Sequence, residues 1–272
     1  LEHVLDRADA KPNEIVHALW SLQRVGGLDA ERLRKFAKHP DRTVRVHVMR
    51  LLAEVSDLSG LRQTAAVQAL RDSDAMVQRT AAEALARNPE QEVYIRPLLA
   101  LLEKVPQEDV QLRHMTRMAL RNQFAQGGPA LSYRRYNPEA AGVIADLCLA
   151  IPSEEAAAFL LEHIQARPTD RAKTTEYVRH ASRHIPAEGA EKLALFVKKE
   201  FGNDLDQQLA FFKAIQEGNA QRGTELGRET RAWGMELAGK LIGSAGGDGV
   251  PWWNVPLAQA KVTTNPWFLQ QR

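Results

Sequence analysis

Three arginines spaced four residues apart are the side chains of this sequence best suited to binding chemistry. Arg113, Arg117 and Arg121 share one face of a predicted helix by that spacing, and Arg134 and Arg135 follow shortly after. Guanidinium groups gathered in this way bind anions, so the ligand could be phosphate, nucleic acid or an acidic protein. These five arginines form part of the predicted interaction surface of the chain.

The charge balance argues against nucleic acid as the ligand. Acidic residues interleave with the arginines at Glu103, Glu108 and Asp109. The whole chain carries 36 basic and 34 acidic residues, which gives a formal charge of +2. A nucleic-acid-binding protein normally concentrates basic residues on one face. We therefore do not expect nucleic acid to be the partner.

A pair of histidines has the spacing of metal ligands but lacks the surroundings of a metal site. His180 and His184 share one face of a predicted helix, and such a pair binds metal when a third ligand converges on it. No glutamate stands beside His180 as in the His-Glu-x-x-His motif, and Arg179 and Arg183 would repel a cation. We predict an exposed polar face here and no metal site.

The remaining candidates for catalysis are also weak. Cys148 is the one cysteine, and its apolar neighbours predict a buried packing residue. The glycine-rich run 243–249 lacks both the Gly-Lys-Ser/Thr ending and the preceding strand of a phosphate-binding loop. No nucleophile, base and acid stand in a recognisable spacing. We predict no catalytic, cofactor-binding or metal-binding residue, no cofactor and no enzymatic activity.

An internal repeat supplies the elements that must position these side chains. Asp41, Asp74 and Asp109 each begin the same pattern: an aliphatic residue three positions on, then Arg or Gln, a small residue four past the aliphatic one and Leu eight past it. The aliphatic, small and Leu positions share one helical face, so they predict a buried stripe. Each aspartate is predicted to cap its helix. His17, His47 and His114 recur beside the stripes and are expected to hydrogen-bond to the neighbouring repeat.

A second apolar segment and a short polar turn precede each aspartate, which predicts two helices per repeat. The fold class is therefore all-α, a HEAT-like α-solenoid with an irregular C-terminal tail. We predict regular repeats over residues 1–125, further antiparallel helices with degenerate repeats over 126–242, and a Gly- and Trp-rich tail or linker over 243–272. Helices of the second part are expected at Arg171–His184, Glu188–Phe201, Asp204–Gln216 and Thr224–Ile242, with Pro168, Pro186, Gly202 and Gly218 between them.

The tail carries three of the five tryptophans. Trp252 and Trp253 complete the predicted interaction surface, either as a docking element or as a strap that packs on the helices. We favour the strap, because an exposed tryptophan pair promotes aggregation. No apolar run approaches the roughly 18 residues that span a membrane, and residues 1–6 have no signal-peptide profile. We expect the chain to be a segment of a longer protein.

The run Val16–Asp29, followed by His39–Arg45, resembles the HEAT-repeat region of large multidomain proteins of planctomycetes and verrucomicrobia. Those bacterial proteins carry a sugar-dehydrogenase-like β-propeller, a HEAT region and a cytochrome c domain, and they are usually predicted to be exported. Residues 265–270 are similar to the junction with a further domain in them. The resemblance implies a periplasmic or exported location and flanking domains as partners. It carries over no redox site, because the sequence contains no Cys-x-x-Cys-His motif.

The function expected from these patterns is that of a non-catalytic helical-repeat scaffold. It would bind proteins, or bind and space domains, and the resemblance implies that it does so within a larger exported oxidoreductase-like protein. The alternative is an enzyme on a HEAT-like scaffold, such as a DNA glycosylase or a chromophore lyase. A deep pocket with buried polar groups would favour the enzyme, whereas a shallow groove lined by solvated Arg and Glu would favour the scaffold.

Overall fold

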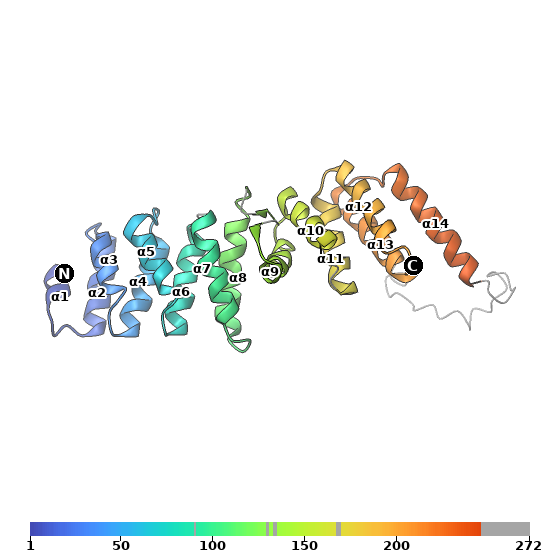
Figure 1. Ribbon diagram of the computed structural model, residues 1–272. Helices are drawn as coiled ribbons and strands as arrows, with labels where there is room; N and C mark the ends of the chain where they lie inside the picture. Colours follow the sequence, from blue (N-terminus) through green and yellow to red (C-terminus); the bar gives the residue numbers. More distant parts are fainter. Residues whose placement is uncertain (90, 129–130, 133–134, 167–169, 246–272) are drawn as a thin grey trace, which may run out of the picture. The chain divides into compact units, whose positions relative to one another are not determined.

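The computed structural model describes residues 1–89, 91–128, 131–132, 135–166 and 170–245, which contain fourteen α-helices and no β-strand (Figure 1). The all-α prediction is therefore confirmed for this part of the chain. The chain divides into two compact units, Leu1–Pro168 and Thr169–Arg272. The predicted three-part division by repeat regularity stays a prediction. No helix of the described residues is long and apolar enough to cross a membrane.

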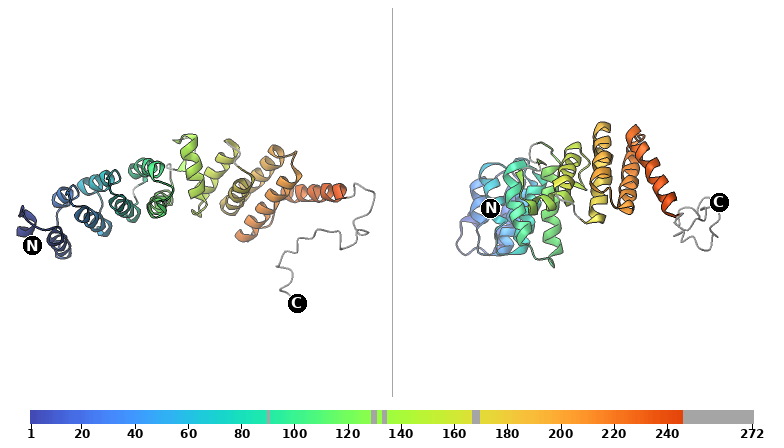
Figure 2. Two further views of the ribbon diagram at one scale, coloured as in Figure 1. Left: turned by 90° about the horizontal axis from the view of Figure 1, so that it is seen from below. Right: turned by 45° about the vertical axis from the view of Figure 1, so that its right-hand side comes forward.

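The first unit is built from consecutive helices that pack mainly on their close neighbours in the chain. Helices α2, α4, α6 and α8 each pack on the next, α3 packs on α5, and α5–α6 and α7–α8 form close pairs. Figures 1 and 2 show these helices following one another in chain order. The helices of this unit are α1 Glu2–Asp6, α2 Pro12–Arg24, α3 Ala30–Phe36, α4 Arg42–Glu54, α5 Gly60–Ala69, α6 Ala75–Arg87, α7 Gln91–Lys104, α8 Val110–Phe124, α9 Pro138–Cys148 and α10 Glu154–Ala166.

The three repeated aspartates begin helices α4, α6 and α8, as predicted. Asp41 accepts a hydrogen bond from the backbone N–H of Thr43 at 2.7 Å, and Asp109 accepts one from Leu112 at 3.0 Å. Asp74 accepts hydrogen bonds from two backbone N–H groups of the first turn of α6. Each cap satisfies a donor that the helix itself leaves unpaired, which stabilises a helix by about 1 kcal/mol.

The predicted stripes are buried between successive helices. Their residues in α4, α6 and α8 are at most 3% exposed: Val44, Val48, Leu51, Leu52, Val77, Ala81, Ala84, Leu85, Leu112, Thr116, Ala119 and Leu120. Two of the four stripe residues of α6 are alanines, and small side chains let helix axes approach closely. The repeat pattern therefore identifies the packing faces correctly.

The second unit contains four helices of 14 to 18 residues among the described residues. They are α11 Arg171–His184, α12 Ala187–Glu200, α13 Leu205–Arg222 and α14 Arg228–Ala245. The predicted break at Gly218 is wrong, because α13 continues through it. A Cβ atom on Gly218 would lie 2.6 Å from the Cβ of Ser182 and 2.8 Å from the carbonyl oxygen of Arg179, both on α11. Because glycine has no Cβ, α13 approaches the backbone of α11 closely at this position.

Candidate functional site

A pocket of about 520 Å³ lies in the first unit and is lined by α7, α8, the start of α9 and the residues just before α9. Four arginines line it: Arg96 from α7, Arg113 and Arg117 from α8, and Arg135 from the segment that precedes α9. We call this site the arginine pocket. Three of these arginines belong to the predicted interaction surface, whereas no sequence pattern singles out Arg96.

Helical spacing explains how α7 and α8 present these side chains. On α7 the lining residues Arg96, Leu99 and Glu103 are three and seven positions apart, so they share one face. On α8, Arg113 and Arg117 are four apart and lie one turn from each other. α7 and α8 pack against each other as a pair, and the two lining faces therefore form adjacent walls of one pocket.

Aromatic contacts anchor the short segment that carries Arg135. The ring of Tyr136 meets Phe124 of α8 at 6.3 Å and Phe159 of α10 at 6.4 Å between centroids, both edge to face. Asn137 caps α9 by accepting a hydrogen bond from the backbone N–H of Ala140 at 2.9 Å. Tyr136 and Asn137 both line the pocket, so these contacts fix its third wall.

The pocket has an excess of positive charge. Four guanidinium groups face two carboxylates, Glu103 and Glu139, and arginine stays protonated in proteins. Within the described residues, Arg96 and Arg117 make neither an ion pair nor a hydrogen bond. Arg113 donates from Nη2 to the carbonyl oxygen of Val105 at 3.3 Å, but its buried Nε finds no acceptor among the described residues. The guanidinium groups of Arg96 and Arg117 therefore remain available to a ligand, and the Nε of Arg113 lacks an acceptor.

Apolar side chains lie between the charged ones. Leu99 and Leu102 of α7 and Val143 of α9 all line the pocket. A pocket with an apolar surface and a few polar groups selects a ligand by shape and by charge together. The lining therefore suits an anionic group that is attached to an apolar one.

The other members of the predicted interaction surface are not part of this pocket. Arg121 donates from Nε to the carbonyl oxygen of Ala150 at 3.1 Å and ties α8 to the turn before α10. The reason is geometric, because each step of four residues rotates a side chain by about 40° around a helix. Arg121 is thus turned about 80° from Arg113. Arg134, Trp252 and Trp253 lie outside the described residues.

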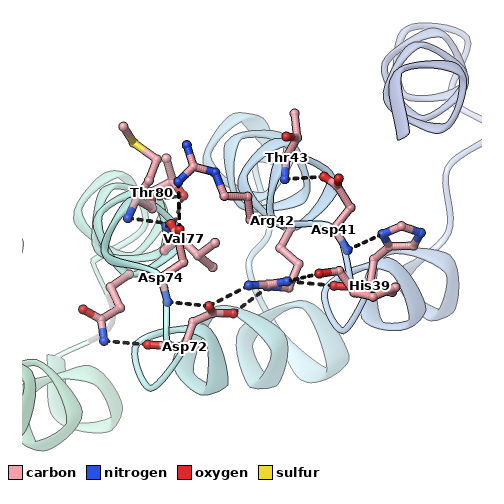
Figure 3. A network of polar contacts seen from close by, with 12 residues as sticks. His39, Asp41, Arg42, Thr43, Asp72, Asp74, Val77 and Thr80 are labelled. Atoms are coloured by element: carbon pink, nitrogen blue, oxygen red, sulfur yellow. Dashed lines mark hydrogen bonds and ion pairs between the residues drawn. The ribbon is translucent and has the colours of Figure 1, made fainter. Parts of the chain in front are cut away.

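A second cluster of charged groups joins α4 to the turn that precedes α6 (Figure 3). Arg45 donates from Nε and Nη2 to both carboxylate oxygens of Asp72, at 2.8 and 2.9 Å, and from Nη1 to the carbonyl oxygens of His39 and Pro40. The carboxylate of Asp72 also accepts the backbone N–H of Asp74 at 2.9 Å. Hydrogen bonding to Asp72 raises the pKa of Arg45. Because these groups satisfy one another, the cluster is a structural tie between α4 and the turn before α6.

The Arg45 position recurs in the next two repeats, with the same type of contact. Gln78 donates to the carbonyl oxygen of Asp72 at 2.8 Å, and Arg113 donates to that of Val105. In each repeat, this side chain bonds the turn that precedes its own helix. Among these three side chains, only Arg45 pairs with a carboxylate, that of Asp72. Arg113 has no acidic partner among the described residues.

The histidine expected to bond across repeats does so at one position. His47 Nδ1 accepts a hydrogen bond from the indole N–H of Trp20 at 3.0 Å, which joins α4 to α2. Burial, then the charges of Arg50 and His17, lower the pKa of His47. The other two histidines of the predicted series, His17 and His114, are exposed. Their predicted hydrogen bonds have no counterpart among the contacts described.

The remaining candidates for chemistry do not form a second site among the described residues. The rings of His180 and His184 lie 4.6 Å apart, and no group of three or more metal-binding side chains gathers in the described part of the chain. Cys148 is buried in α9, and burial raises the pKa of its thiol to about 12. The prediction that Cys148 is a buried packing residue is confirmed.

Comparison with known proteins adds no relative to these observations. No family model matches the chain, and no curated protein and no solved structure matches it either. The sequence resemblance to a HEAT-repeat region therefore stays a prediction.

Proposed function

We propose that this chain is a non-catalytic, HEAT-like helical-repeat scaffold that binds protein segments. Within its longer parent protein it would dock or space the neighbouring domains. The resemblance to exported dehydrogenase–cytochrome c proteins suggests that these neighbours belong to an oxidoreductase and that the protein is exported.

The observation that carries the proposal is the packing order of α2, α4, α6 and α8. Each of these helices buries its stripe against the next one, and capped turns link the repeats. Proteins built in this way keep one face of every repeat available along the stack, and they commonly use it to bind other proteins. This arrangement supports a binding role more directly than any single residue does.

The arginine pocket supports the same interpretation. Arg96, Arg135, Glu103 and Glu139 are all exposed at its walls. Charged groups that stay in contact with water at the rim of an open site are typical of a surface that receives another protein. The pocket is the natural position for one charged segment of the partner.

Binding in trans tests the proposal. The polypeptide segments encoded directly before and after this chain are produced separately and titrated against it by calorimetry. We expect a saturable complex with at least one segment, with a dissociation constant of about 1 μM or lower. Failure of both segments to bind, or the lack of any encoded neighbour, contradicts the proposal. Binding to duplex DNA with a steep salt dependence, or base excision from it, favours the glycosylase instead.

A further inference from the structure

We infer that the arginine pocket binds an acidic segment of a protein, with a carboxylate of that segment paired to Arg113. This inference rests on the proposed function in one respect, namely that the partner is a protein. It adds the location of the contact and the chemistry of the group that occupies it. Another arginine of the same chain, Arg45, already has such a partner.

Arg45 shows what this repeat position does when a carboxylate is present. Its Nε and Nη2 bind the two oxygens of Asp72, and Nη1 binds backbone carbonyl groups. Arg113 occupies the same position two repeats later and keeps a backbone contact, to Val105. Its Nε, which corresponds to the atom that binds Asp72 in the first case, is buried and has no partner among the described residues. A carboxylate from outside the chain would supply the missing acceptor.

The neighbouring arginines extend the site beyond one carboxylate. Arg117 lies one turn along α8, and Arg96 faces the same pocket from α7. Neither has an ion pair or a hydrogen bond within the described residues. Planar guanidinium groups bind carboxylates through two parallel hydrogen bonds, so three adjacent arginines suit a segment with several acidic side chains.

The lining of the pocket favours an acidic peptide over nucleic acid. Glu103 and Glu139 stand among the arginines, and the chain as a whole has a formal charge of only +2, whereas a nucleic-acid-binding protein concentrates basic residues on one face. Leu99, Leu102 and Val143 offer apolar contacts that a sugar-phosphate chain does not use but that a leucine or valine of a peptide does. A volume of about 520 Å³ accepts a few side chains of such a peptide. The expected ligand therefore alternates acidic and apolar residues.

Fluorescence anisotropy with a labelled peptide tests the inference on the complete chain. The probe is a peptide of about twelve residues that alternates glutamate and leucine, a length that covers one groove-binding segment. Arg117→Glu and Arg96→Glu are the test variants, because neither side chain has a structural partner in the described residues. Arg24→Glu is the matched control: Arg24 is exposed on α2, lies outside the pocket, and changes the net charge equally. Thermal unfolding verifies that all three variants fold.

We expect each test variant to weaken binding at least tenfold and the control to weaken it less than twofold. A peptide with glutamine in place of glutamate is expected to bind at least tenfold more weakly than the probe. Equal affinity of the glutamine peptide, or equal weakening by Arg24→Glu, overturns the inference. So does tighter binding of a phosphorylated peptide or of duplex DNA at the same arginines.

The inference and the proposed function fail in different ways. If a flanking domain binds the chain and the acidic peptide does not, the inference is wrong and the scaffold role stands. If the acidic peptide binds through Arg96 and Arg117 but no flanking domain binds, the pocket is correct and the proposed role toward neighbouring domains is wrong. The two titrations together decide both questions.

Discussion

Replacing Asp72 with alanine should destabilise the first unit at the contact between α4 and the turn before α6. The substitution removes two hydrogen bonds from Arg45 and one from the backbone N–H of Asp74. It also leaves the guanidinium of Arg45 with only backbone carbonyl partners. The side chains of Arg45 and Asp72 are 14% and 13% exposed, so little water reaches the orphaned charge.

The expected loss of stability is about 2–4 kcal/mol. Breaking a fully buried ion pair costs about 3–5 kcal/mol, whereas exposed pairs contribute about 0–1 kcal/mol. The Arg45–Asp72 pair is mostly buried and is held by two parallel hydrogen bonds, so its cost should be close to that of a fully buried pair. The pair between Arg42 and Asp74 is the internal control, since Arg42 is 67% exposed and makes one contact at 3.1 Å. Arg42→Ala should therefore cost less than about 1 kcal/mol.

Native-state hydrogen exchange followed by mass spectrometry measures this effect segment by segment. Amides of α4 and α6 in Asp72→Ala should exchange about 30-fold faster or more, since about 1.4 kcal/mol corresponds to a factor of ten. The second change Arg45→Met should remove most of the further cost of Asp72→Ala, because no unpaired charge then remains. An Asp72→Ala variant that exchanges no faster than Arg42→Ala would refute this reasoning.

Three further predictions concern single residues. Gly218→Ala should lower the melting temperature, because the added Cβ meets Ser182. Gly239→Ala should raise it slightly, because Gly239 is helical and a Cβ added there meets no atom within 4 Å. Equal shifts of the two variants in thermal scans would contradict this reasoning. The lowered pKa of His47 means that the folded state binds fewer protons than the unfolded state, so stability should fall as pH drops below about 6.5. His47→Asn should reduce this dependence of the unfolding free energy on pH, as measured by urea titrations. An unchanged pH dependence would contradict the assignment to His47. The thiol of Cys148 is buried and its pKa is raised to about 12. At mildly alkaline pH it should therefore react with a disulfide reagent only when the chain unfolds. Rapid labelling of the native chain would show instead that the thiol is accessible.

The features that the sequence predicts well are local ones. An aspartate that caps a helix needs only the next few residues of the chain, and the caps at Asp41, Asp74 and Asp109 are present as predicted. The buried stripes follow from the period of the helix in the same way. Repetition strengthens each of these signals, because three copies agree on which positions face the neighbouring helix.

The features that the sequence does not predict depend on contacts between distant residues. Arg96 joins the arginine pocket because α7 packs against α8, and no spacing within α7 marks it. The residue type of Gly218 predicts the end of a helix, yet α13 continues through it because α11 packs closely against this position. The spacing of four that groups Arg121 with Arg113 is correct over one turn only, since the rotation accumulates along the helix.

Removal of the first two helices tests the central claim, that the first unit is a stack of repeats each held mainly by its neighbours. A chain that begins at residue 28 lacks α1 and α2 but keeps the helices α6 to α9. Hydrogen exchange of α8 in this shortened chain is the measurement. If the repeats stack as proposed, α8 should keep its protection to within about threefold, because its contacts lie with α6, α7 and α9. Loss of protection throughout α8 would show instead a single cooperative core and would contradict the repeat scaffold.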